Sequence, residues 1–295
     1  MKNIKLKQTR FFPGMTLKFL RNFLHLFIML LLFSFSSNAQ YFYKDIWSNE
    51  QAIKEFSILK NENFKIVKIK SFEDDGQPSE GFFCEKKINK NYTQSEMISK
   101  SYITGQSLLV SDYDNGGRPV KTTDNTPTTT SSTLYEYDSK GRLTKVETVT
   151  KADDDLAGIT EIHEYFYEGD SLVKMIRKKN NLLISTIHFV NDASGNVIEE
   201  NTEGGTTDKK YFYYYDSKNR LTDVVHFNER AGRLLPDYMY EYDSLNKPSQ
   251  MISTEEGGNN YFIWKYKYND KNLREAEKCF SREKRILGTI EYEYK

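Results

Sequence analysis

A short aromatic motif recurs along the last two-thirds of the chain and restricts its fold more than any other feature of the sequence. The clearest copies occupy residues 135–143, 213–221 and 240–248, and weaker copies centre on Tyr113, Tyr167, Asn191 and Tyr268. Successive anchor positions, at 113, 137, 167, 191, 215, 242, 268 and 294, lie 24 to 30 residues apart. A nearly constant period of this length indicates that one supersecondary unit is used repeatedly.

Each unit has the pattern of a β-hairpin. In the copy that begins Tyr135-Glu136-Tyr137, the two-residue period of a strand places both rings on one face and the glutamate on the other. Asp138 and Ser139 follow, and such short polar side chains hydrogen-bond the backbone of turns. Seven hairpins supply about 14 strands, or roughly 65 Å of sheet, and sheets of that width curl, split or close. We therefore expect a mainly all-β fold, a curled antiparallel sheet of about seven hairpins that is aromatic on its concave face.

The turn of each hairpin has a recognisable left-handed position. Six of the seven complete units carry glycine or asparagine four residues after the anchor, at Gly117, Gly141, Gly195, Asn219, Asn246 and Asn272. Both residue types tolerate φ > 0, so we predict positive φ there. The seventh unit has Ser171 at this position and Gly169 two residues earlier. Leu143 and Val146 are three residues apart, which predicts either a β-bulge or a Leu143 that belongs to the turn.

The motif at 135–143, Tyr-x-Tyr-Asp-x-x-Gly-Arg-Leu, resembles the YD repeat of the RHS family, and 213–221 is nearly as close. The resemblance covers about 107–295. In that family, YD repeats build the strands of a large β-shell that encloses a toxin or displays a surface. The chain resembles a short exported member without an RHS core segment or a toxin domain.

Residues 40–106 do not repeat and are predicted to form a small α+β module. Ser48 to Gln51 has the pattern of a capping box, so we predict a helix over 48–60 and then strands at 64–69 and 81–84. We expect this module to cap the open first edge of the sheet that 107–295 forms, as repeat arrays require. Two connections are also predicted, a Thr/Ser loop at 126–133 and an inserted acidic loop at 153–155.

The first 39 residues have the layout of a secretory signal peptide. A basic segment without acidic residues precedes an apolar run from Phe23 to Phe33, and Ser37-Asn38-Ala39 sets a cleavage site before Gln40. The apolar run is shorter than the roughly 20 residues of a membrane helix. We expect an exported protein, in the periplasm, on the outer surface or in the medium, without an integral membrane segment after cleavage. Met15 is an alternative translation start, which would leave a signal peptide of ordinary length.

Charge and cysteine content limit the partners of the exported chain. The signal segment holds six of the 42 basic residues and none of the 42 acidic ones, so the remainder has a net charge of 36 − 42 = −6. A chain of this charge without a basic stripe is not expected to bind nucleic acid. Cys84 and Cys279 either form a disulfide or stay apart as buried thiols, and we favour separate thiols because sequence does not place their Cα atoms within bridging distance.

No motif for catalysis, a metal or a cofactor is recognisable. His163, His188 and His226 fall in different repeats without ligand spacing, and we interpret them as half-buried strand residues. We expect a non-catalytic scaffold or binding protein of the cell envelope, with a surface glycan or another envelope protein as partner. The alternatives are an accessory or immunity-type partner of a secreted assembly, or a carbohydrate-active enzyme.

The tyrosines are the residues on which a binding function would rest. Tyr137, Tyr215 and Tyr242 occupy equivalent positions and should form one row with similar, core-like environments. Aromatic residues beside the anchors remain available to stack on a glycan or a peptide. The candidates for ligand binding are Tyr102, Tyr261 and Trp264.

Overall fold

The computed structural model describes residues 41–295, with the exception of 154–157, 206–208, 229–230 and 255–259. The predicted signal peptide, its cleavage site and most of the predicted acidic loop lie outside the described residues. The elements are α2 (Tyr43–Asn61), β1 (Ile66–Phe72), β2 (Phe83–Ile88), β3 (Gln94–Ser101), β4 (Gly105–Tyr113), β5 (Pro119–Asn125), β6 (Thr129–Tyr137), β7 (Leu143–Ala152), β8 (Ile159–Glu168), β9 (Ser171–Lys179), β10 (Leu182–Asn191), β11 (Val197–Glu203), β12 (Lys210–Tyr215), β13 (Leu221–Asn228), β14 (Arg233–Tyr242), β15 (Pro248–Thr254), β16 (Tyr261–Tyr268), β17 (Arg274–Phe280) and β18 (Ile286–Tyr294).

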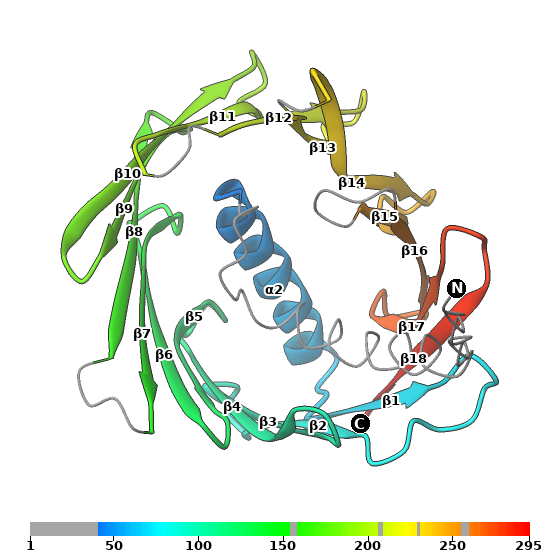
Figure 1. Cartoon of the computed structure of the whole chain (residues 1–295). Coiled ribbons are helices and arrows are strands. Elements are labelled where there is room, and N and C mark those ends of the chain that lie inside the picture. Colours follow the sequence, from blue (N-terminus) through cyan, green and yellow to red (C-terminus); the bar gives the residue numbers. More distant parts are fainter. Residues whose placement is uncertain (1–40, 154–157, 206–208, 229–230, 255–259) are drawn as a thin grey trace, which may run out of the picture. The chain divides into compact units, whose positions relative to one another are not determined.

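The 18 strands form one antiparallel sheet that closes on itself. Every strand pairs with its neighbours in sequence, and β18 pairs with β1 from Val67–Tyr294 to Phe72–Thr289. Figure 1 shows the resulting ring of strands around α2. The predicted all-β class is therefore confirmed, but the prediction of an open, curled sheet of seven repeats is wrong. The sheet closes because β1 offers one edge to β2 and the other to β18.

The predicted α+β cap is also wrong. The strands of residues 66–88 belong to the wall of the ring, and α2 lies inside the ring rather than across a free edge (Figure 1). The helix begins at Tyr43, five residues before the predicted capping box, and its N-cap residue Phe42 makes no side-chain cap. The predicted Thr/Ser loop is shorter than expected, because β6 already begins at Thr129.

The predicted left-handed turn positions are confirmed. The φ angles of Gly117, Gly141 and Gly195 are 80°, 81° and 83°, and those of Asn219, Asn246 and Asn272 are 57°, 64° and 66°. In the exceptional unit it is Gly169, with φ 58°, that takes the left-handed conformation. The β-bulge is confirmed as well, because Tyr137 pairs with Leu143 whereas Glu136 pairs with Lys145. The same shift occurs in all seven hairpins, where it adds local twist to a sheet that has to close.

The other motif residues bond one hairpin to the next. Asp114 accepts the backbone N–H of Arg118 through Oδ1 at 2.9 Å and its Nε–H through Oδ2 at 2.6 Å. The Arg118 guanidinium in turn lies 5.0 Å from the ring centre of Tyr137, the anchor of the next hairpin. Tyr137 donates its hydroxyl hydrogen back to the carbonyl of Pro119 at 2.9 Å. The YD motif is thus a chain of contacts along the rim of the ring.

Equivalent anchors have equivalent environments, as predicted for the tyrosine row. From Tyr137 onward, the hydroxyl of each tyrosine anchor donates to the carbonyl of the residue that opens the return strand of the preceding hairpin, whereas that of Tyr113 bonds the Ser95 hydroxyl. The pairs are Tyr137–Pro119, Tyr167–Leu143, Tyr215–Val197, Tyr242–Leu221, Tyr268–Pro248 and Tyr294–Arg274. The anchors are half-buried, so the core-like environment predicted for this row is not confirmed. They join neighbouring hairpins at one end of the ring, which we call the turn end.

The left-handed turns give a stability prediction at Gly195, where an added Cβ meets no atom within 4 Å. Gly195→Ala should lower the free energy of unfolding by about 1–2 kcal/mol, because only the backbone conformation is penalised. Gly195→Asn should cost clearly less, since asparagine occupies this position in three other hairpins. Urea unfolding measures both losses, with Asn219→Gly as the control for the reverse exchange. Equal losses for Ala and Asn would mean that the left-handed conformation is not what the position requires.

Within the described ranges, no helix has both the length and the hydropathy of a membrane span. Cys84 and Cys279 are buried and are not joined by a disulfide.

Candidate functional site

The aromatic face of the sheet points into the ring. Tyr165, Tyr211, Tyr213 and Tyr240, which lie two or four residues before the anchors, are all buried. The helix packs on this face through aromatic contacts. Phe56 stacks on Tyr113 with ring centres 3.8 Å apart and planes at 13°. At the other end of the helix, Tyr43 meets the edge of the Tyr213 ring at 5.2 Å.

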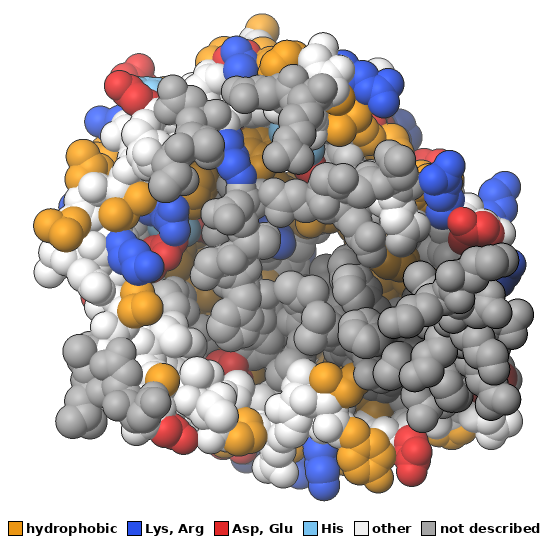
Figure 2. Space-filling model, in the orientation of Figure 1, with side chains coloured by type: hydrophobic (Ala, Val, Ile, Leu, Met, Phe, Trp, Pro, Cys, Tyr) orange, Lys and Arg blue, Asp and Glu red, His pale blue; other side chains and the backbone are white. Residues whose placement is uncertain are grey.

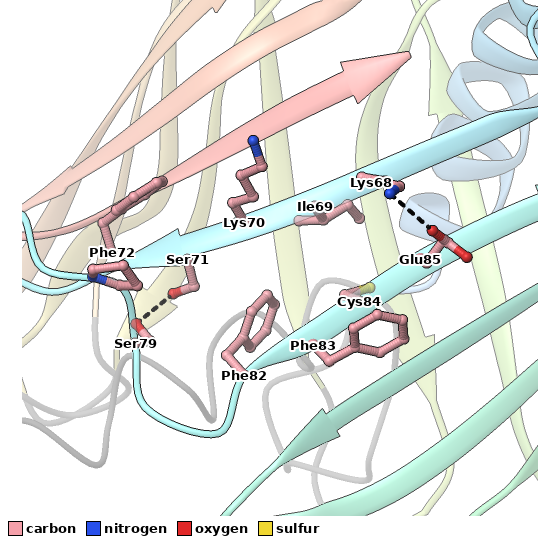
Figure 3. Close-up of a pocket in the computed structure, with 11 residues that line it drawn as sticks. Lys68, Ile69, Lys70, Ser71, Phe72, Ser79, Phe82, Phe83, Cys84 and Glu85 are labelled. Atoms are coloured by element: carbon pink, nitrogen blue, oxygen red, sulfur yellow. Dashed lines mark hydrogen bonds and ion pairs between the residues drawn. The ribbon is translucent and has the colours of Figure 1, made fainter. Parts of the chain in front are cut away.

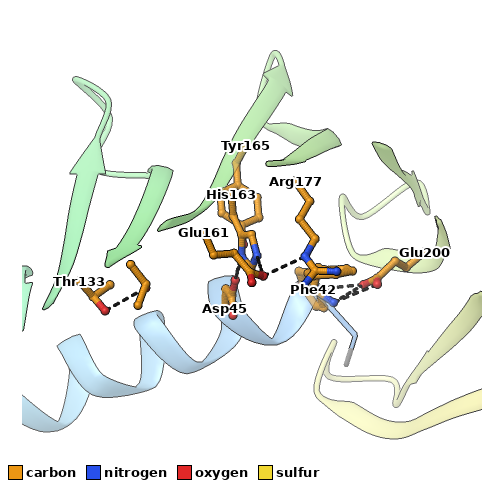
Figure 4. A network of polar contacts seen from close by, with 10 residues as sticks. Phe42, Asp45, Thr133, Glu161, His163, Tyr165, Arg177 and Glu200 are labelled. Atoms are coloured by element: carbon orange, nitrogen blue, oxygen red, sulfur yellow. Dashed lines mark hydrogen bonds and ion pairs between the residues drawn. The ribbon is translucent and has the colours of Figure 1, made fainter. Parts of the chain in front are cut away.

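Buried polar bonds fix the first turn of α2 to the wall (Figure 4). Glu200 on β11 accepts the N–H of Phe42 at 2.9 Å and that of Tyr43 at 2.9 Å. It also accepts the hydroxyl hydrogen of Tyr213 at 2.7 Å. Burial raises the pKa of the Glu200 carboxyl to about 7, although these three donors favour its ionised form. A carboxylate that is remote in sequence therefore replaces the missing N-cap side chain.

A second set of contacts continues from the helix along β8 and β9 (Figure 4). Asp45 accepts hydrogen bonds from His163 Nδ1 at 2.7 Å and from the Tyr165 hydroxyl at 2.6 Å. His163 Nε2 contacts Glu161 at 3.0 Å, and Glu161 accepts from Arg177 Nε at 2.8 Å. Burial opposes the charge on His163, but the bonds to the two carboxylates outweigh it and raise its pKa to about 9. The protonated imidazole uses both ring nitrogens, so its role here is to hold the helix in place.

The raised pKa of His163 makes stability depend on pH. The unfolded imidazole has a pKa of about 6.5, so its contribution is complete below that pH and is lost as pH rises through about 9. Wild type should therefore lose about 3 kcal/mol of unfolding free energy over the whole range, of which about 2 kcal/mol falls between pH 7.5 and 9.5, and His163→Asn should not. Urea unfolding between pH 7.5 and 9.5 measures this loss. The range lies above the pKa of Glu200, about 7, so titration of that carboxyl contributes little to the difference. Parallel pH curves for the two proteins would contradict it.

The helix does not fill the lumen, which is the space inside the ring of strands. The side chains of Glu50 and Lys54 on α2 are 58% and 67% exposed although the helix lies inside the ring (Figure 1). Part of the wall that faces the lumen is rich in hydroxyls, which bond in pairs between neighbouring strands. These pairs are Ser99–Ser107, Thr133–Thr148 and Ser131–Thr150. The interior therefore combines tyrosine rings, hydroxyls and solvent.

A polar cavity of about 220 Å³ lies between α2 and the turn end of β7 to β11, and we call it the turn pocket. Its lining includes Tyr43, Ile46 and Glu50 of the helix and Arg142, Tyr167 and Asn191 of the wall. The Arg142 guanidinium lies 4.2 Å from the ring centre of Tyr167 and donates from Nε to Asp138 at 2.7 Å. Asn191 Nδ2 donates to the carbonyl of Leu172 at 2.7 Å. Its Oδ1 is buried and has no hydrogen-bond partner among the described residues.

A second, larger hollow of about 440 Å³ lies where β1 and β2 separate (Figure 3). These strands pair only from Ile66–Lys87 to Ile69–Cys84. Beyond this point the hollow is lined mainly by apolar side chains, among them Phe72, Phe82 and Phe83. Burial raises the pKa of the Cys84 thiol to about 12, so this thiol is not a nucleophile at neutral pH. The polar side chains that line the hollow include the ion pair Lys68–Glu85 and the hydrogen-bonded pair Ser71–Ser79.

The residues singled out from sequence do not form a common site. Tyr102 lies on the β3–β4 connection and is 73% exposed, whereas Trp264 in the middle of β16 is 1% exposed. Tyr261 begins β16, and its distance of three residues from Trp264 places the two on opposite faces. Their assignment as ligand-binding residues remains a prediction. His163, His188 and His226 lie on β8, β10 and β13, and no group of metal-ligating side chains occurs in the residues that the structure describes.

Sequence reasoning missed the turn pocket. It also missed the polar tether of α2, by which we mean the bonds of Phe42 to Glu200 and of Asp45 to His163. The tether joins residues more than 110 positions apart, and no local pattern reveals such a pair. The pocket had one sequence signal. Asn191 is the single complete hairpin anchor that is not a tyrosine.

Comparison with known proteins yields weak structural neighbours. No protein-family model matches the chain, and no curated protein matches it. A porin-like protein from Bacteroides uniformis aligns over 79% of this chain and 96% of its own, with a TM-score of 0.38 and 12% identity. The Tc holotoxin pore of Photorhabdus luminescens aligns over 72% of this chain, with a TM-score of 0.29 and 10% identity. A complex of TcdB2 with TccC3 that lacks the hypervariable C-terminal region aligns over 70%, with a TM-score of 0.23 and 11% identity. The chain spans 16% of the length of each of the two Tc chains.

Proposed function

We propose that this chain is an exported, non-catalytic glycan-binding shell of the cell envelope, built from YD-type repeats. The observation that carries the proposal is the turn pocket, where tyrosine rings meet an unpaired buried acceptor beside the exposed Glu50 side chain of α2. Ring faces together with nearby hydrogen-bonding groups suit sugars, which have both apolar faces and hydroxyls. The hydroxyl-rich part of the inner wall extends the same chemistry along the lumen.

The polar groups around the first turn of α2 support a structural role over a catalytic one. Asp45, Glu161, His163 and Glu200 are the acid–base side chains of this region, and each is engaged in bonds that hold α2. A general acid or base needs a free position within hydrogen-bond reach of its substrate. In the His163 network both ring nitrogens are already used.

The outer wall supports a shell that faces water. Outward positions carry lysine–glutamate pairs that cross between strands, at Lys68–Glu85, Lys70–Glu293, Lys145–Glu136, Lys178–Glu164 and Lys267–Glu275. Figure 2 shows charged side chains of both signs along the outline of the face in view, with hydrophobic side chains between them. A lipid-facing strand wall instead presents an apolar band about 25 Å tall. Charge pairs at these positions favour an aqueous surface.

The proposal is tested with the protein that begins at Gln40 and a panel of soluble hexasaccharides of glucose, mannose, xylose and N-acetylglucosamine. Saturation-transfer NMR should detect binding of at least one of them, and chromatography should show its length unchanged after incubation. Failure to bind any sugar would overturn the glycan assignment, and shortened products would overturn the non-catalytic one.

N-terminal sequencing of the extracytoplasmic protein should give Gln40 as the first residue. Recovery of residues 15–39 on a membrane species would contradict export by cleavage.

A further inference from the structure

We infer that the turn pocket is the vacancy left by one missing repeat tyrosine, at Asn191, and that it holds a single pyranose ring. The inference rests on the proposed glycan-binding function and names the subsite at which it acts. The other hairpins of the repeat show which side chain would fill this position if the motif were complete.

Asn191 stands where the other complete hairpins have a tyrosine. All of those tyrosines except Tyr113 donate to the carbonyl that opens the preceding return strand, as Tyr167 does to Leu143 at 3.0 Å. Asn191 Nδ2 donates to the equivalent carbonyl of Leu172 at 2.7 Å. Its strand pairing is also that of an anchor, since Asn191 pairs with Val197 across the bulge. The asparagine thus keeps the hydrogen bond between hairpins and omits the ring.

The space beside Asn191 has the size of a six-membered ring. The cavity measures about 220 Å³. A protein cavity of about 150 Å³ is large enough to hold benzene. Apolar side chains of Ile46, Leu143 and Val197 line it together with the rings of Tyr43 and Tyr167. One ring therefore fits, with aromatic and aliphatic surface to pack against.

The polar groups around the vacancy favour a sugar over a phenol. Asn191 Oδ1 is a buried acceptor without a partner, and the carboxylate of Glu50 is an exposed acceptor on the helix side. On the wall side, Arg142 pairs with Asp138 through Nε and Nη2 and donates to the carbonyl of Gly169 through Nη1, and each Nη carries a second N–H. A phenol has one hydroxyl, whereas a pyranose has hydroxyls on several sides of its ring. Acceptors and a donor on different sides of the pocket match the pyranose.

A matched pair of variants tests the inference. Asn191→Tyr restores the anchor and should fill the pocket with the ring that the other hairpins carry. It should fold, melt no lower than wild type, and lose detectable binding of the hexasaccharide that wild type binds. Asn196→Arg restores another motif residue of the same hairpin. The Asn196 side chain bonds Asp192 and Asn219, away from the pocket. That control should bind as wild type does.

Each result decides a different part of the inference. Equal sugar binding by wild type and Asn191→Tyr would overturn the pocket as the subsite and leave the glycan-binding function standing. Absence of sugar binding by wild type would overturn both. A markedly lower melting temperature of Asn191→Tyr would overturn the vacancy, since a tyrosine would then not fit. Binding of N-acetyltyrosinamide but of no sugar, lost in Asn191→Tyr, would reassign the pocket to an aromatic side chain and overturn the pyranose.

Discussion

Replacing Tyr213 by alanine should lower the free energy of unfolding by about 3–5 kcal/mol, as truncation of large buried aromatic residues does. Its side chain is 2% exposed and donates its hydroxyl hydrogen to Glu200. It also packs against Tyr41 and Tyr43 of the segment that leads into α2, with ring centres 6.0 and 5.2 Å away. The variant therefore loses wall packing and part of the helix attachment together.

Tyr214 is the matched control, because it is the next residue of the same strand and points outward. Its side chain is 49% exposed, so Tyr214→Ala should cost less than about 1 kcal/mol. Tyr213→Phe should fall between the two, since it keeps the ring and removes one donor from a buried carboxyl. Urea unfolding measures all three. Similar losses at positions 213 and 214 would mean that the inward face is not the packed one.

Asp45→Ala should destabilise the protein by about 3–5 kcal/mol, the range for removing one partner of a buried ion pair. The change leaves His163 and the Tyr165 hydroxyl without the acceptor that both use. It should also lower the pKa of His163, because one of the two carboxylates that raise it is gone. The pKa can be followed by NMR titration of the imidazole in variant and wild type.

Lys54→Ala is the control for Asp45→Ala, because Lys54 lies on the same helix and its side chain is 67% exposed. Substitutions at surface positions usually change stability by less than about 0.5 kcal/mol, so the expected loss is about a tenth of that for Asp45→Ala. An Asp45→Ala protein with wild-type stability would show that the aromatic contacts alone hold α2. In that case the polar network would not serve as the tether.

The repeat predicted local structure well because its information is local. Gly141, the bulge after Tyr137 and the anchor row follow from residues within one hairpin, and all three are present. Closure of the ring was not predictable, because nothing in the sequence of β1 marks it as the partner of β18. The helix start was missed for a related reason, since Glu200 caps it from 158 residues away.

The candidate site was only partly accessible to sequence reasoning. An aromatic inner surface follows from the Tyr-x-Tyr period, but the choice of Tyr102, Tyr261 and Trp264 does not coincide with the pocket. Those residues were selected because they flank the repeat. The pocket instead arises inside the repeat, where Asn191 departs from the anchor pattern. The pocket that results from this asparagine becomes visible only when the positions of the neighbouring residues in space are known.

The seam between β1 and β18 gives the folding reaction an unusual final requirement. Other strand pairings join neighbours in sequence, whereas this one closes a loop of roughly 230 residues. Closing it costs about 2 kcal/mol more chain entropy than closing a loop of one repeat. Pairings between residues so far apart in sequence form slowly, so pairing of β1 with β18 should be the rate-limiting step of refolding. Until it forms, β1 and β18 each present an unpaired edge that a second copy of the chain can occupy, and concentrated refolding should therefore yield strand-exchanged dimers.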